Sequence, residues 1–339
     1  MVADTLLIPP VRRAAIEALA PELLAAKRVA LSTHINSDGD GCGSEAALAL
    51  LLAQTGTDVR IVNPTPWPAM YDYLLAGGVR DESPRGAAAL REVDRLVVLD
   101  ISDVRRLGTL ADAVRKLPKP PLVIDHHLPG DEPPGTMHVT DTTACATGEL
   151  IYDVAVVLGL NITPHIATAI YTAILTDTGG FRFSNTSARC LAVAAQMIAA
   201  GVEPESMYRR IYASMSLGRI RLLSEALGTV TVDPALGIAT IDVEAGQIER
   251  HNVTPEDLDG VAEYPRSIEG TKLALLFRDL GHGKVKVSFR SIGSVDSNAI
   301  ARRFGGGGHA KAAGALVEGS MQDVKAKVLA VAQELLDGE

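Results

Sequence analysis

Three short apolar segments of this chain each end in carboxylate or imidazole side chains, and helix-type segments separate them. The segments and the polar residues that follow them are 28–32 with His34, Asp38 and Asp40, 95–99 with Asp100, and 121–124 with Asp125, His126 and His127. Buried strands that alternate with helices form a parallel sheet, and the carboxyl ends of its strands share one edge. The pattern therefore predicts an α/β fold in which an N-terminal doubly wound, mainly parallel sheet gathers these side chains.

The pattern of the chain changes after residue 200. A length of 339 residues suggests about two domains. Residues 1–200 carry the strand and helix alternation, and residues 201–228 read as a helical linker. Residues 229–339 hold short β-type runs with two helical stretches, which predicts a smaller C-terminal α+β domain.

The candidate ligands favour a metal site. A helix-type segment ends beside Asp177, which brings the set to five carboxylates and three imidazoles without a thiolate. Such a set suits Mn²⁺ or Mg²⁺ better than Zn²⁺ or Fe²⁺, and we expect Mn²⁺ first. Two divalent cations would neutralise the acids and form a phosphoryl-transfer clamp.

The first of these loops has a second interpretation when taken alone. His34, Asp38 and Asp40 could belong to a polar loop with a helix N-cap. Gly39, Gly41 and Gly43 are expected to let the loop turn tightly and a ligand come close.

Composition excludes several classes of protein. The net charge of −9 argues against a protein that coats long duplex nucleic acid. No apolar run is long enough for a membrane span, and the N-terminal residues lack a signal-peptide core. Three widely spaced cysteines without a CxxC pair argue against structural zinc and favour a reducing, cytoplasmic location.

These motifs together resemble the DHH phosphoesterase superfamily. Asp125-His126-His127 ends a strand, and the HxxxDxD motif of His34, Asp38 and Asp40 lies upstream. Residues 288–291 (SFRS) and 304–314 (FGGGGHAKAAG) resemble the DHHA1 domain. The two-domain length is most similar to the NrnA-type members of the RecJ-like branch. One departure is Ser37, which stands where the family often has proline.

The resemblance implies a role for each candidate residue. His34 and Asp38 match ligands of a first metal, Asp40 and His126 match ligands of a second, and Asp100 and Asp177 match positions that bridge or complete the pair. His127 matches the histidine that faces the scissile phosphate, and Asp125 would orient a histidine. The residues expected to bind the substrate's other phosphate are Arg290, Gly306, Gly307, Gly308 and His309.

The implied activity is metal-dependent hydrolysis of short oligoribonucleotides, such as pApA, to mononucleotides, and of 3′-phosphoadenosine-5′-phosphate to AMP. The expected partners are short RNA and phosphorylated nucleotides, without a membrane or long duplex, and a homodimer is left open. The net charge of −9 gives no long basic track for a polymer backbone, and 4% aromatic residues offer few stacking platforms, so short substrates are favoured.

Other functions stay open on the sequence alone. One is a non-catalytic nucleotide sensor, although Ser44 breaks the GxGxxG spacing after Gly39 and Gly41. Another is a RecJ-like single-strand exonuclease. A soluble pyrophosphatase is weaker, since that family carries a different C-terminal domain.

Overall fold

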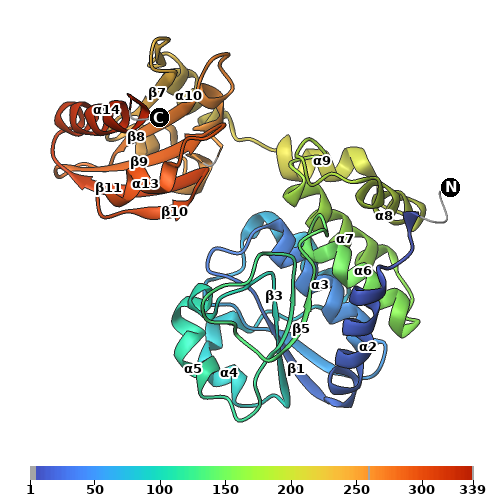
Figure 1. The fold of residues 1–339 in the computed structure, drawn as a ribbon. Coiled ribbons are helices and arrows are strands. Elements are labelled where there is room, and N and C mark those ends of the chain that lie inside the picture. Colours follow the sequence, from blue (N-terminus) through green and yellow to red (C-terminus); the bar gives the residue numbers. More distant parts are fainter. Residues whose placement is uncertain (1–4, 259, 338–339) are drawn as a thin grey trace. The chain divides into compact units, whose positions relative to one another are not determined.

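A computed structural model describes residues 5–258 and 260–337, and in it the chain divides into two units, residues 1–214 and 215–339 (Figure 1). The division falls inside the segment 201–228. Helix α9 (Pro204–Tyr212) belongs to the first unit, and helix α10 (Leu217–Leu227) belongs to the second.

A five-stranded sheet forms the centre of the N-terminal unit. Its strands are β1 (Arg28–Ser32), β2 (Asp58–Ile61), β3 (Arg95–Leu99), β4 (Leu122–Asp125) and β5 (Met137–Thr140). They lie in the order β2-β1-β3-β4-β5, and every pair of neighbours is parallel. The predicted parallel sheet is confirmed. Strand β5 was not predicted, because it is a short edge strand with Val139 as its one buried residue.

Helices cover both faces of this sheet. The helices and 3₁₀ segments of the unit, besides α9, are α2 (Pro10–Ala25), α3 (Gly39–Ala53), η1 (Ala69–Gly78), η2 (Ser83–Arg85), α4 (Ala87–Leu90), η3 (Val104–Leu110), α5 (Ala111–Arg115), α6 (Thr147–Leu158), α7 (Pro164–Asp177) and α8 (Ala188–Ala199). The larger core takes Val29 and Leu31 of β1 with α2, α3, α6, α7 and α8. A smaller core takes Ala30 with α4, η3 and α5 on the other face. Alternate residues of one strand therefore enter different cores, as in a doubly wound fold.

Helix α3 is the central helix of the larger core. It is apolar on nearly all sides, and its residues from Gly39 to Ala49 are buried. A helix that is hydrophobic all round must lie inside the protein. It packs on α6 and α7 and also contacts β1. These contacts fix the position of the start of α3.

The C-terminal unit is built on a mixed sheet. Its elements after α10 are β6 (Thr231–Asp233), β7 (Ile238–Val243), α11 (Gln247–His251), η4 (Pro255–Leu258), α12 (Glu263–Arg266), β8 (Leu273–Asp279), β9 (Lys284–Ser291), α13 (Ser297–Arg302), β10 (Gly307–His309), β11 (Ala312–Glu318) and α14 (Met321–Asp337). The strand order is β10-β11-β9-β8-β7-β6, in which β7 and β8 are parallel and the other pairs antiparallel. This confirms the predicted smaller α+β domain.

Within the described part of the chain, every helix is too short or too polar to cross a lipid bilayer.

Candidate metal centre

The side chains predicted as metal ligands come together in the N-terminal unit as two groups of three, and a third group joins Asp100 and His126 to His127. The first group is His34, Asp38 and Asp100, and the second is Asp40, His126 and Asp177. Within each group the candidate ligand atoms all lie within 4.8 Å of one another. The ends of β1, β3 and β4, the start of α3 and the end of α7 supply them.

The first group is organised around His34. Its Nε2 atom lies 3.5 Å from Asp38 Oδ2 and 3.5 Å from Asp100 Oδ2. Asp38 also caps α3, because its Oδ1 accepts the N–H groups of Asp40 and Gly41, each at 3.1 Å. The N-cap interpretation of this loop is therefore confirmed, and the second oxygen of the same carboxylate stays directed at His34 as a candidate ligand.

The second group is organised around His126. Its Nε2 atom lies 3.5 Å from Asp40 Oδ2, 3.6 Å from Asp100 Oδ1 and 3.7 Å from Asp177 Oδ2.

Asp100 connects the two groups. Its Oδ2 faces His34 and its Oδ1 faces His126, which is the arrangement of a carboxylate that bridges two sites. The backbone of Asp100 has φ of 61°, a left-handed conformation that costs energy outside glycine. Such strained residues concentrate at functional sites, because surrounding structure has to hold them in place.

The two histidines fit a metal site in their orientation. His34 Nδ1 lies 2.9 Å from the carbonyl of Ile35, and His126 Nδ1 lies 3.3 Å from the carbonyl of Ala144. A carbonyl partner fixes the proton on Nδ1 and leaves the lone pair of Nε2 for a cation. Among the described residues, both Nε2 atoms are buried without a hydrogen-bond partner. Buried polar atoms need a partner, and a divalent cation would supply one.

The charges of the cluster point the same way. Burial, followed by the negative charges of Asp100 and Asp177, raises the pKa of Asp40 well above its ordinary value. Burial and Asp100 also raise the pKa of Asp177 to about 6, against the opposite effect of His126. Burial would lower the pKa of His34, but Asp100 and Asp38 raise it to about 10. The site thus gathers negative charge that protons or cations must balance, so metal binding there would release protons.

His127 is held by Asp125. The Nδ1 atom of His127 lies 2.8 Å from Asp125 Oδ1, and the same oxygen accepts the backbone N–H of His127 at 3.2 Å. Asp125 is buried, whereas the side chain of His127 is 38% exposed. Burial would lower the pKa of His127, but the hydrogen bond to Asp125 raises it. Asp125 therefore orients an accessible imidazole.

Several residues that support the ligands were missed by sequence reasoning. The backbone N–H groups of Thr147 and Gly148 donate to Asp40 at 2.7 and 2.9 Å, and the Thr147 hydroxyl donates to Asp100 Oδ1 at 3.1 Å. A helix start such as that of α6 carries unpaired N–H groups, but only the fold shows which anion they meet.

Asn185 also supports a candidate ligand. It donates to Asp177 Oδ2 at 3.2 Å and to the carbonyl of Cys145 at 2.9 Å. Two residues later, Ser187 caps α8 by accepting the N–H of Cys190.

The glycines of the first motif also act differently from the prediction of a tight turn. Helix α3 begins at Gly39, so all three lie inside it. A Cβ at Gly39 would lie 2.4 Å from Thr176, one at Gly41 would lie 2.7 Å from Thr33, and one at Gly43 would lie 2.5 Å from the carbonyl of Ala169. They are needed because α3 packs directly on α7 and on the end of β1.

The predicted phosphate-binding residues lie in the C-terminal unit. Arg290 is on β9, where its Nε lies 3.3 Å from Glu263 Oε1. Gly307 and Gly308 form part of β10, which pairs with β11, and not a free loop. A Cβ at Gly306 would lie 2.2 Å from the carbonyl of Gly314, so close packing explains part of the glycine run. His309 belongs to β10, and its side chain lies outside the described residues.

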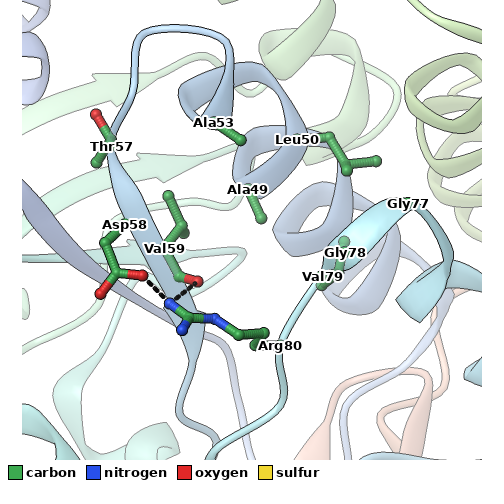
Figure 2. A pocket seen from close by; sticks show the side chains of 10 residues that line it. All are labelled: Ala49, Leu50, Ala53, Thr57, Asp58, Val59, Gly77, Gly78, Val79 and Arg80. Carbon is green, nitrogen blue, oxygen red and sulfur yellow. Dashed lines mark hydrogen bonds and ion pairs between the residues drawn. The ribbon is translucent and has the colours of Figure 1, made fainter.

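A pocket elsewhere in the N-terminal unit contains none of these residues. Figure 2 shows it between α3, β2 and the segment that follows η1, with Arg80 paired to Asp58 and bonded to the carbonyl of Val59. The rest of its lining is small or apolar apart from Thr57, and the pocket holds none of the candidate metal ligands.

Comparison with known proteins agrees with the geometry. Residues 28–174 match the model of the DHH family, N-terminal domain, and residues 237–338 match that of the DHHA1 domain. The chain is 33% identical to the bifunctional oligoribonuclease and PAP phosphatase NrnA of Thermus thermophilus, over 85% of this chain and 84% of that protein. This chain belongs to the NrnA group of the DHH family. The corresponding NrnA of Bacillus subtilis is 26% identical, over 85% of this chain and 89% of the relative.

Solved structures share the fold. An exopolyphosphatase-related protein from Bacteroides fragilis superposes with a TM-score of 0.88 at 25% identity, covering 96% of this chain and 98% of that one. RecJ of Thermus thermophilus in complex with Mn²⁺ superposes with a TM-score of 0.56 at 17% identity, covering 98% of this chain and 56% of RecJ. At that identity the RecJ match supports the fold alone.

Proposed function

We propose that this protein is a metal-dependent phosphoesterase that hydrolyses short oligoribonucleotides to mononucleotides and 3′-phosphoadenosine-5′-phosphate to AMP. The observation that carries the proposal is Asp100, whose two oxygens face the two ligand groups. The substrate class follows from the NrnA relative, which matches most of both chains.

The ligand groups would hold two divalent cations, with Mn²⁺ favoured and Mg²⁺ as the alternative. His34, Asp38 and Asp100 form the first group, and Asp40, His126 and Asp177 form the second. Two cations held in adjacent groups would activate water and stabilise charge on the phosphoryl oxygens.

The chain's own residues supply orientation and a hydrogen-bond donor. Asp125 engages Nδ1 of His127, which leaves Nε2 of the half-exposed ring to meet a phosphate oxygen. Asp125 and His127 are therefore the proposed catalytic pair. We propose that Arg290, Gly306, Gly307, Gly308 and His309 bind a further phosphate of the nucleotide. Remote binding energy of this kind raises the rate by positioning the reacting group.

The test is a substrate panel assayed with Mn²⁺ at one fixed salt concentration. It contains RNA oligomers of increasing length from the dinucleotide, 3′-phosphoadenosine-5′-phosphate, long single-stranded DNA, pyrophosphate and polyphosphate. We expect the highest kcat/KM for di- to pentanucleotide RNA and for 3′-phosphoadenosine-5′-phosphate, with no turnover in chelator.

Each other outcome points to a different function. Efficiency that climbs with length would indicate a RecJ-like exonuclease. Turnover of pyrophosphate or polyphosphate alone would indicate an inorganic phosphatase, and binding of nucleotides without turnover would indicate a sensor.

A further inference from the structure

A cluster of buried charges lies in the N-terminal unit outside the metal-ligand groups. Arg12 of α2 is only 3% exposed, and Glu149 and Asp153 of α6 are 1% and 0% exposed. Arg12 Nη1 lies 2.8 Å from Glu149 Oε1 and 2.8 Å from Asp153 Oδ2, and its Nε lies 2.8 Å from Asp141 Oδ2. Arg189 of α8 adds a second cation, with Nε 2.9 Å from Glu149 Oε1 and a further bond to Asp153.

Glu149 connects this cluster to the start of α6. Its Oε1 accepts from both arginines, and its Oε2 accepts the backbone N–H of Cys145 at 3.0 Å. Glu149 thereby fixes the backbone that enters the helix.

The same short segment binds two of the candidate metal ligands. The N–H groups of Thr147 and Gly148 hold both oxygens of Asp40, and the hydroxyl of Thr147 holds Asp100. Hydrogen bonds thus lead from Arg12 through Glu149 to Cys145, the backbone of residues 145–148 continues the path, and hydrogen bonds from Thr147 and Gly148 complete it to the carboxylates.

Stability alone is a weak reason for such a cluster. Removing charges from water costs several kcal/mol for each ion, and apolar residues of similar size often serve a core equally well. The arginines do, however, fix the position of Glu149 in a way that apolar contacts would not, because each charged hydrogen bond has a defined direction.

We propose that Arg12 and Arg189 are positioning residues for the metal centre. Acting through Glu149, they hold the start of α6 so that Asp40 and Asp100 keep the orientation that cations need. This inference rests on the metal-dependent function proposed above. Arg12 lies before residue 28, where the match to the DHH family begins, so the proposal gives a role to a helix outside the matched residues.

The test compares Arg12→Gln with a matched control, Arg60→Gln. Arg60 is also buried, at 7% exposure, and it pairs with Asp58, Glu82 and Glu92 on and near β2. Both substitutions remove a buried arginine from an ion cluster, although the carboxylates around Arg60 are more exposed than those around Arg12. Only the Arg12 cluster connects to residues 145–148. Mn²⁺ affinity is measured by titration calorimetry on the full chain without substrate, and circular dichroism establishes that each variant is folded.

We expect Arg12→Gln to weaken Mn²⁺ binding by about tenfold or more, the usual effect of losing a residue that orients a metal ligand. Arg60→Gln should leave the affinity unchanged while lowering stability. Equal losses in the two variants, or unchanged affinity in a folded Arg12→Gln protein, would overturn the proposal.

If Arg12→Gln does not fold, Arg189→Gln decides the question in the same assay. The side chain of Arg189 is 13% exposed, and the substitution removes one of the two cations that pair with Glu149. Weaker Mn²⁺ binding supports the proposal, and unchanged binding rejects it. A wild-type protein that binds Mn²⁺ without hydrolysing nucleotides would contradict the proposed function and not this inference.

Discussion

Asp100 is the residue whose two carboxylate oxygens face the two groups of candidate ligands. We predict that Asp100→Asn lowers turnover of nucleotide substrates to below about one hundredth of wild type, since even residues behind the ligands affect metal sites by ten- to a hundredfold. Asp103→Asn is a nearby control, because Asp103 caps η3 and pairs with Arg105. Turnover assays with Mn²⁺ test this, and near-normal activity in Asp100→Asn would contradict it.

The same substitution should not unfold the protein. Burial is the largest cause of the raised pKa of Asp40 and of Asp177, and the negative charge of Asp100 raises both further. The charge of Asp100 therefore opposes the ionisation of these two carboxyl groups. Removing that charge relieves this repulsion but also removes the favourable interaction by which Asp100 raises the pKa of His34, so we expect little net change in the free energy of unfolding in chelator. Urea unfolding measures it, and a clear loss of stability would show that Asp100 has a structural role.

Glu45 predicts a dependence of stability on pH. Burial raises the pKa of Glu45 from an ordinary 4.5 to about 8, although the hydrogen bond from Asn63 lowers it. The folded state therefore holds this proton more tightly than the unfolded state, and stability should fall as pH rises from about 4.5 to about 8. Glu45→Gln keeps the shape and removes the titration.

Urea unfolding of wild type and of Glu45→Gln, each in chelator at pH 5 and at pH 8.5, measures the contribution of this titration to stability. Wild type should lose on the order of a few kcal/mol relative to Glu45→Gln across this interval. The exposed Glu244→Gln is the control. If wild type and Glu45→Gln change in parallel, Glu45 is ionised in the folded protein and the prediction is wrong.

At the scale of elements, the contact of α3 with α7 depends on glycine. A Cβ at Gly43 would lie 2.5 Å from the carbonyl of Ala169 and 2.9 Å from the amide of Ala173, both backbone atoms of α7. We predict that Gly43→Ala lowers the free energy of unfolding by about 1–3 kcal/mol, even though alanine favours helices.

Gly307→Ala provides the comparison for this effect. The nearest atom to its added Cβ would be Asn298 Oδ1 at 3.8 Å, so little change is expected. Urea titrations of both variants give the answer, and a Gly43→Ala protein as stable as wild type would mean that α3 can move away from α7.

At the scale of the whole molecule, the candidate metal ligands belong to the N-terminal unit and the proposed phosphate-binding residues belong to the C-terminal unit. We predict that Arg290→Ala lowers kcat/KM on nucleotides by about ten- to a hundredfold, the effect of a lost charged hydrogen bond. A small generic phosphodiester should be much less affected, because it has no second phosphate to bind.

Glu263→Gln controls for the ion pair of Arg290. It removes the partner that lies 3.3 Å away and leaves the guanidinium in place. If both variants behave alike, or if both substrate types lose equally, Arg290 supports the fold and does not bind the substrate.

The sequence by itself was enough to predict the parallel sheet, the smaller α+β domain and the residues that form the two ligand groups. These features are local: apolar strands followed by acids and imidazoles predict where side chains meet, because the ends of parallel strands share one edge. The family resemblance assigned His34, Asp38, Asp40 and His126 to two groups, and the structure places them in those groups.

Only the tertiary structure decided what surrounds these residues. Asp40 accepts hydrogen bonds from Thr147 and Gly148, which are more than a hundred residues away in the sequence. Asp177 accepts one from Asn185, across the turn that follows α7. No rule of sequence spacing predicts these contacts. The glycines of α3 serve packing against α7, which a single segment cannot reveal. The orientation of Asp100 and the burial of Arg12 likewise arise from contacts between elements, because pairing and burial are properties of the folded core and not of a local pattern.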